Sequence, residues 1–441
     1  MEEKSIGGYK TIGKLLYFHL AVVFAQFGIR WYADLTIVRD FFIFLILWVA
    51  LSSSLGYKKD KLSKSVILLL IYGVVMMLVH SVSGTGFISS LAEFRNYFFP
   101  FFLMLPLSVY FTRAQNREHF VNFIYVLFII LLIDVYFEGL LEMLGVSRDF
   151  LPWYQYQYIH SVRFITSENP IDRAIYPENA PVLGLLGWAN ATACTLVALY
   201  AFLAPFIFTG SIRDNTKLGR KSNTNKIFIV IAVIGALVIL EIKTPMFAFL
   251  VASFILMLRS NKKVAMNLMA AFVAVAIVAY LTKGLWMDTF SFLVEESTGD
   301  EGAISYVFSI ATLSSVFSSF IGSSFLSVLF GGDFTGLSYY ENIEIRILTF
   351  TMQLGVIWLI SFLYVCFSTV KESLKINKVE YLTLVDRRLN LGVLLMLLVY
   401  FIDMLHYSYL MYLFNINLFA VCIALIVGLN SSFKNKNIYV S

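Results

Sequence analysis

Residues 120–144 read FVNFIYVLFIILLIDVYFEGLLEML, and most of them are apolar. A helix needs about twenty consecutive apolar residues to cross the hydrocarbon core of a bilayer. The stretch therefore predicts a membrane-spanning helix. It also carries Asp134, Glu138 and Glu142, which are spaced four residues apart and so share one helix face.

The rest of the chain is similarly rich in apolar residues. The whole chain has 441 residues, of which 59% are hydrophobic and 14% are charged, whereas a soluble domain has roughly 25% charged residues. The composition predicts an all-α polytopic membrane protein that forms one integral membrane domain over residues 1–441, without a cleavable signal peptide. We expect twelve spans, at about 12–29, 36–55, 64–81, 97–111, 120–144, 182–209, 227–241, 244–258, 264–282, 343–370, 389–407 and 409–428.

The distribution of Lys and Arg predicts how these spans are oriented. Basic residues gather in alternate short connections and in the C-terminal tail, and such connections usually lie in the cytoplasm. These connections are residues 56–64, 112–119, 211–226, 259–263 and 371–388. Both termini are therefore expected on the cytoplasmic side.

Two long connections are expected on the opposite side, at residues 145–181 and 283–342. The second contains an apolar, Ser-rich stretch at 306–330. Counting this stretch as a full crossing would place residues 371–388 outside, against the distribution of basic residues. We therefore expect a re-entrant or interfacial segment, or two half-helices.

Charged residues gather at the outer mouth of the span at 343–370. The stretch Tyr339–Leu348 contains Glu341, Glu344 and Arg346. Charges at such a position are costly to desolvate, so they usually have a function. We interpret this stretch as one wall of an active site that faces away from the cytoplasm. On an ideal helix Glu344 and Arg346 point in nearly opposite directions, so both serve one site only if the helix begins close to them.

Other carboxylates lie inside apolar segments. Asp134 and Glu138 are expected to line a polar cavity, although pairing with Arg or Lys from another helix would also explain them. Asp403 lies three residues before His406 near the outer end of the eleventh span. That pair is a candidate proton shuttle, and ordinary packing is the alternative.

Candidate anion-binding residues are found on the same side. Arg95 stands beside Glu93 at the start of the fourth span, and Lys243 follows Glu241 in a short turn. Each could hold a phosphate or could simply form an ion pair at the membrane interface. Two further candidates lie in the first outer loop, namely Arg163 and Arg173.

Several functions are disfavoured. The sequence has no Walker loop, no HExxH and no Cys/His metal-ligand set, and Cys194, Cys366 and Cys422 all lie in apolar segments. We expect no metal, no cofactor and no nucleic-acid partner. The cytoplasmic connections are too short for a catalytic domain, so chemistry is expected on the outer side with an already activated substrate.

Four stretches resemble the bacterial O-antigen polymerase and O-antigen ligase superfamily. They are residues 187–193 (GWANATA), 242–246 (IKTPM), 344–355 (EIRILTFTMQLG) and 405–407 (LHY). Lys243 stands where the family has Arg, and Glu344 stands where ligases have His. The loss of that His favours a polymerase over a ligase.

The resemblance implies an inverting, metal-independent glycosyl transfer between undecaprenyl-diphosphate-linked oligosaccharides at the periplasmic face of the bacterial inner membrane. Glu344 would be the base, with His406 as the second candidate. The substrate and its diphosphate would contact Arg95, Arg163, Arg173, Asn190, Lys243, Glu341 and Arg346. The resemblance also suggests membrane lipid and a chain-length regulator protein as partners.

Two other functions remain open. One is an O-antigen ligase, which hands the glycan to a non-repeat acceptor. The other is a lipid-linked oligosaccharide flippase or transporter, since twelve spans are common among transporters, although no internal sequence repeat is evident.

Overall fold

The computed structural model describes residues 2–26, 36–53, 60–83, 86–148, 150–153, 182–208, 223–240, 242–259, 265–266, 269, 273, 322, 324–332, 346–377, 382–404, 410 and 413–437. These residues form helices and no strands. The helices are α1 (Glu2–Phe24), α3 (Thr36–Ser52), α4 (Lys61–Ser83), α5 (Phe87–Tyr97), η1 (Phe99–Leu103), α6 (Met104–Tyr110), α7 (Ala114–Met143), α9 (Ala189–Phe208), α10 (Asn223–Ile239), α11 (Lys243–Arg259), α15 (Phe325–Phe330), α16 (Arg346–Leu354), α17 (Val356–Ile376), α18 (Leu384–Met404) and α19 (Leu413–Asn437).

Five of the described helices are long and apolar enough to cross a membrane: α4, α7, α9, α17 and most of α19. Large apolar side chains point outward from the periphery of the bundle, among them Trp48 and Leu51 on α3, Ile133 on α7 and Phe228 on α10. Extensive exposed apolar surface of this kind is typical of contact with lipid. The prediction of an all-α membrane protein is confirmed at this level.

The centre of the bundle is α9. Every residue of α9 from Ala191 to Phe208 is buried, because α7, α10, α11 and α18 pack around it. A helix that is apolar all round is stable only where other helices cover all its faces. Gly392 on α18 faces the backbone carbonyl of Phe202, and a side chain there would overlap that oxygen. The missing side chain lets α18 approach α9 closely.

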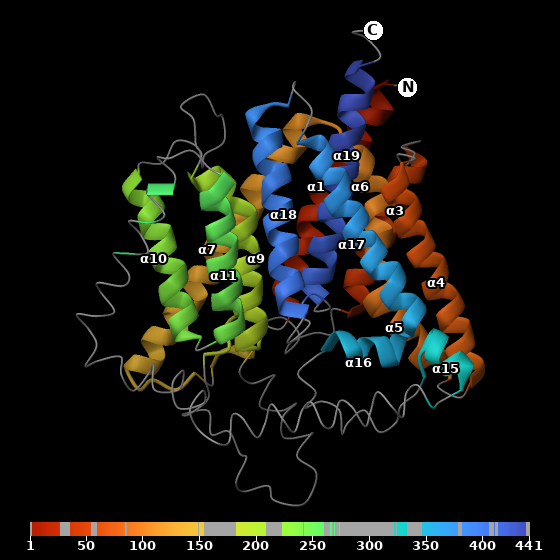
Figure 1. Cartoon of the computed structure of the whole chain (residues 1–441), viewed down its shortest axis with the longest axis horizontal. Coiled ribbons are helices and arrows are strands. Elements are labelled where there is room, and N and C mark those ends of the chain that lie inside the picture. The colour runs from red at the N-terminus through yellow and green to blue at the C-terminus, as the bar shows by residue number, and fades with distance from the viewer. Residues whose placement is uncertain are drawn as a thin grey trace, which may run out of the picture.

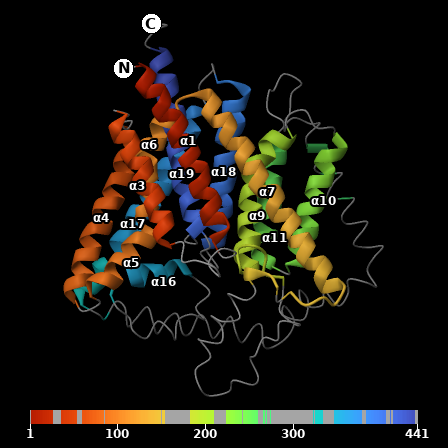
Figure 2. The same cartoon turned by 180° about the vertical axis from the view of Figure 1, so that it is seen from behind.

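The two ends of the bundle differ. Helix α1 begins and α19 ends at the same end, which we call the terminal end (Figures 1 and 2). There Arg117 of α7 donates to Asp386 of α18 at 2.9 Å and to the carbonyl of Phe111 at 2.7 Å. We call the opposite end, where α5, α15 and α16 lie, the distal end. The side of the membrane that each end faces stays a prediction.

The segment predicted as one span over 343–370 is not a continuous helix. It is interrupted at Gly355, which has φ 86° and ψ 161°. Helix α17 continues along the bundle, whereas α16 lies across the bundle axis at the distal end (Figure 1). Few residues other than glycine adopt this backbone conformation, so Gly355 fixes the point of the break.

A second glycine makes the break compact. Gly331, which ends α15, has φ 79°, and a side chain on it would overlap the carbonyl of Gln353. A side chain on Gly355 would in turn overlap the carbonyl of Leu329. The two backbones therefore cross in direct contact. The Tyr72 hydroxyl of α4 donates to the carbonyl of Leu354 at the same place.

Two other predicted segments also differ from expectation. Residues 97–111 form η1 and α6, an apolar helical segment that is shorter than the five long helices. Helix α5, which precedes it, was not predicted. Of the stretch 306–330, the described helix is α15, a short helix beside α4, α16 and α17. Most of the predicted span 264–282 lies outside the described residues.

Candidate functional site

Two arginines share one carboxylate at the distal end. Arg39 and Asp40 lie near the start of α3, and Arg39 Nη2 is 2.8 Å from Asp40 Oδ1. Arg95, in the last turn of α5, brings its Nε to 3.2 Å from Asp40 Oδ2. The Arg39 side chain is 2% exposed and that of Arg95 is 36% exposed. We call these three residues the arginine site.

The arginine site corrects one expectation about Arg95. The alternative to a ligand-binding role was an ion pair with Glu93, but Arg95 pairs with Asp40 instead. Glu93 lies two residues earlier on α5 and faces other partners. Within the described part of the chain, the guanidinium of Arg95 has no further partner besides Asp40. Its Nε lies within ion-pair distance of the carboxylate without the geometry of a hydrogen bond, and its two Nη groups can bind an anion.

A layer of buried polar side chains lies deeper in the same half of the bundle. His19 Nε2 of α1 lies 2.9 Å from Asn417 Oδ1 of α19. Asn415 Oδ1 accepts from Thr195 Oγ1 of α9 at 3.0 Å and from the Tyr400 hydroxyl of α18 at 3.1 Å. Burying such groups is tolerated only when they are hydrogen-bonded. We call these five residues the buried polar layer; they join α1, α9, α18 and α19.

Asp403 and Asn190 lie next to this layer. Asp403, in the last turn of α18, is buried and contacts the thiol of Cys194 on α9. Asn190 is one helical turn before Cys194, and its Oδ1 is buried with no hydrogen-bond partner among the described residues. The structure thus places two of the predicted site residues on facing ends of α9 and α18. His406, the expected partner of Asp403, lies outside the described residues.

The carboxylates of α7 have partners that the sequence did not indicate. Glu138 Oε1 accepts from the Trp153 indole at 2.5 Å, and its Oε2 accepts from the backbone amides of Leu183 and Gly184 at 3.2 and 3.1 Å. Asp134 Oδ2 accepts from the Leu185 amide at 2.5 Å. These contacts anchor the turn that precedes α9, whereas the expectation was a cavity wall or pairing with basic side chains.

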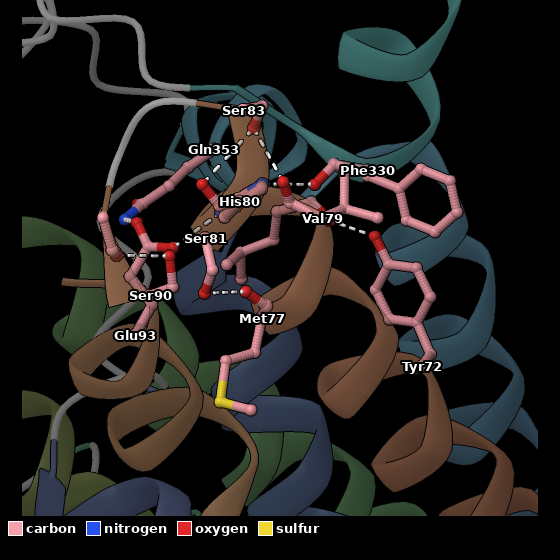
Figure 3. Close-up of polar contacts among 12 residues, drawn as sticks. Tyr72, Met77, Val79, His80, Ser81, Ser83, Ser90, Glu93, Phe330 and Gln353 are labelled. Carbon is pink, nitrogen blue, oxygen red and sulfur yellow. Dashed lines mark hydrogen bonds and ion pairs between the residues drawn. The ribbon is translucent and has the colours of Figure 1, made fainter. Parts of the chain in front are cut away.

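Sequence reasoning missed a second polar cluster at the distal end, which joins α4, α5, α15 and α16 (Figure 3). His80 Nδ1 is 3.0 Å from Glu93 Oε2, and His80 Nε2 is 2.8 Å from the carbonyl oxygen of Phe330. Gln353 Nε2 donates to Glu93 Oε1 at 3.0 Å. We call these four residues the His80 cluster. A histidine near the end of an apolar segment was the available signal.

An apolar cavity of about 390 Å³ lies between α11, α17, α18 and α19. Its lining includes Ile255, Val370, Leu398 and Phe401. Tyr400, which also belongs to the buried polar layer, is part of the lining as well. The cavity therefore borders the buried polar layer at Tyr400.

The remaining predicted residues are only partly placed. Lys243 and Arg346 are the first residues of α11 and α16. The others lie outside the described residues: Arg163, Arg173, Glu341, Glu344 and His406. Their roles stay predictions.

Comparisons with protein families, with curated proteins and with solved structures give no match to this chain.

Proposed function

We propose that the protein is a membrane glycosyltransferase that joins lipid-linked oligosaccharide repeat units, in the manner of an O-antigen polymerase. Its donor would be a glycan on undecaprenyl diphosphate, and its acceptor would be the sugar hydroxyl of a second lipid-linked unit. The observation that carries the proposal is the arginine site. The partly exposed guanidinium of Arg95 is paired with the carboxylate of Asp40 at one end of an apolar bundle. A guanidinium in this position can bind a diphosphate at the membrane surface.

The arginine site supplies what the leaving group requires. When the bond between the anomeric carbon and the diphosphate breaks, negative charge accumulates on the departing oxygen. Preorganised cations and hydrogen-bond donors stabilise such charge. The ion pair with Asp40 keeps Arg95 Nε beside the carboxylate, which leaves its Nη edge for the diphosphate. Arg346, the first residue of α16, is the second proposed cation, and the family resemblance adds Lys243 and Arg173.

The proposed reaction needs one base. The acceptor hydroxyl oxygen attacks the anomeric carbon, the carbon–oxygen bond to the diphosphate breaks with inversion, and the electron pair leaves with the diphosphate. The proton of the hydroxyl passes to a carboxylate or an imidazole. Glu344 is the proposed base because it stands at the family's His position, and His406 is the second candidate.

The apolar cavity supports a lipid-linked substrate. An isoprenoid tail needs a water-free path beside the bundle, and the cavity between α11, α17, α18 and α19 offers apolar walls. The proposal also includes the finer topology: twelve spans, both termini in the cytoplasm of a bacterium and the distal end in the periplasm. A chain-length regulator protein would be a further partner.

The test uses purified protein in liposomes with lipid-linked repeat units from the source organism. Longer glycan chains, separated on gels, support the proposal. Transfer only to a non-repeat acceptor would show a ligase, and movement across the bilayer without bond formation would show a flippase. Either of these results contradicts the proposal.

A variant series tests the role of the arginine site. Removing a donor to developing negative charge typically costs about 10²-fold in rate, so we expect a loss of about that size in Arg95→Ala. Arg95→Lys should recover part of the rate, because charge remains without the two-pronged geometry. The matched control is Arg113→Ala at the terminal end, where the guanidinium lies 3.8 Å above the Tyr9 ring. Equal rates in the Arg95 and Arg113 variants would contradict the role of Arg95.

A further inference from the structure

The ring of His80 lies between two hydrogen-bond acceptors from different helices (Figure 3). Its Nδ1 faces the carboxylate of Glu93 on α5, and its Nε2 faces the backbone carbonyl of Phe330 at the end of α15. Both distances, 3.0 and 2.8 Å, are those of good hydrogen bonds. His80 is 2% exposed, so water cannot easily replace either partner.

The chemistry of the two partners determines the protonation of the ring. A neutral imidazole carries one N–H and one acceptor nitrogen, whereas an imidazolium carries two N–H groups. A carbonyl oxygen never donates, and an ionised carboxylate accepts only. A neutral ring would therefore direct one lone pair at an oxygen. With Glu93 ionised, two satisfied contacts require a proton on each ring nitrogen.

We propose that His80 is a buried imidazolium and a positioning residue, which holds α15 and α16 in fixed relation to α5. The functional part of this inference rests on the proposed glycosyl transfer. Glu93 accepts from His80 with one oxygen and from Gln353 of α16 with the other. Arg95 lies two residues after Glu93 on α5, and Arg346 begins α16. The His80 cluster therefore links the two helices that carry proposed diphosphate-binding cations.

The backbone crossing of Gly331 and Gly355 adds to this link. Phe330, whose carbonyl accepts from His80, directly precedes Gly331, and Gln353 lies two residues before Gly355. Tyr72 of α4 also stacks on the Phe330 ring, with ring centroids 5.9 Å apart. A change at His80 is thus transmitted to the ends of both α15 and α16.

The arrangement makes the link dependent on pH. The groups that face His80 from the elements packed against it are Glu93 of α5 and the backbone of Phe330 and Gly331 at the end of α15. Gln353 of α16 faces Glu93. At pH values at which the His80 ring is protonated, its hydrogen bonds to Glu93 and to the carbonyl of Phe330 are both present. As the pH rises through the titration of His80, one bond is lost and the end of α15 is released.

Glu93→Gln distinguishes this mechanism from simple packing. A glutamine at position 93 can donate to Nδ1 of a neutral ring and accept from Gln353, while Nε2–H still donates to Phe330. The complete set of hydrogen bonds then exists without the extra proton. The variant is therefore expected to fold like the original protein and to lose the pH dependence.

The first experiment measures the ring protonation directly. The purified protein is labelled with ¹⁵N-histidine, and the His80 signals are identified by their disappearance in His80→Gln. At neutral pH we expect two similar ring-nitrogen resonances, which mark an imidazolium. In Glu93→Gln we expect two widely separated resonances, which mark a neutral tautomer. A neutral ring in the original protein would overturn the proposal.

The second experiment follows hydrogen exchange of the amides at 328–332, corrected for the intrinsic effect of pH. Loss of one hydrogen bond of this type corresponds to about a tenfold change in an equilibrium. Protection is expected to fall about tenfold between about pH 6 and about pH 9, either side of the ordinary histidine range. Glu93→Gln should show no such fall. The matched control His119→Gln changes an exposed histidine of α7 and should behave like the original protein.

Glycosyl transfer provides the functional measurement. We expect His80→Gln to lower kcat about tenfold with little change in KM, because the cations then meet the departing diphosphate in poorer geometry. If the His80 ring is an imidazolium but His80→Gln leaves kcat unchanged, the positioning role is refuted and the proposed function stands. A protein that makes no product but shows the imidazolium and the pH-dependent protection would refute the proposed function instead.

Discussion

Replacing Gly355 with Ala tests the crossing that separates α16 from α17. Gly355 has φ 86° and ψ 161°, a region where a residue other than glycine costs about 1–3 kcal/mol. The new methyl group would also overlap the carbonyl of Leu329 and lie 2.6 Å from the carbonyl carbon of Phe330. Forcing extra volume into packed atoms costs about 1–3 kcal/mol more. The expected total is about 2–6 kcal/mol.

Thermal unfolding in detergent measures this cost. At about 1 °C per kcal/mol for a chain of 441 residues, Gly355→Ala should lower Tm by about 2–6 °C. Gly86→Ala is the matched control, because Gly86 has φ 80° and ψ 151° and a methyl group on it would meet no atom within 4 Å. Gly86→Ala therefore reports backbone strain alone, with a fall of about 1–3 °C. Gly7 lies inside helix α1, and a methyl group on it would meet no atom within 4 Å. Gly7→Ala should therefore not lower Tm.

The difference between Gly355→Ala and Gly86→Ala isolates the contact between the two backbones. If both variants unfold at the same temperature, α15 and α16 do not cross in the close contact described above. If Gly86→Ala is as stable as the original protein while Gly355→Ala is not, the cost comes from overlap and the assigned backbone strain is wrong.

Three further outcomes are expected. Arg117→Ala leaves Asp386 as an uncompensated buried charge and should destabilise the fold by about 3–5 kcal/mol, whereas the double change Arg117→Met with Asp386→Leu should recover at least half of that loss in thermal unfolding. Glu138→Ala leaves an indole and two backbone amides without their acceptor and should cost about 1–3 kcal/mol per buried group. Glu118→Ala, at a half-buried carboxylate near the start of the same helix, should change Tm little, and equal effects would contradict the anchoring role. Glu344→Gln should abolish chain elongation on gels if Glu344 is the base, and normal chain lengths would remove it from that role.

The sequence predicted the long helices well because each is a continuous apolar run. The stretch at 120–144 corresponds to most of α7, which continues through Gly139 without a break. The span at 343–370 was misjudged at Gly355, because glycine is common inside membrane helices and its backbone conformation cannot be read from composition. Helix α5 was overlooked because its aromatic residues resemble the interfacial start of the next span.

The candidate site was less predictable. Arg95 was identified from its type and position, but its partner Asp40 comes from a helix that is distant in sequence. Asn415 and Thr195 lie in apolar segments that are far apart in sequence, so their shared hydrogen bond is visible only in three dimensions. The partners of Glu138 include backbone amides, and a sequence carries no signal for those. Contacts across helices depend on rotation and depth, which local patterns do not determine.

The buried polar layer also constrains how the protein can move. Asn415 receives hydrogen bonds from α9 and α18 on a single oxygen, and Asn417 contacts α1 only two residues later. Rotation or sliding of α19 by one residue would break these bonds together inside an apolar interior. We therefore expect α1, α9, α18 and α19 to move as one rigid body. Any hinge would lie outside this body, toward the distal helices α5, α15 and α16.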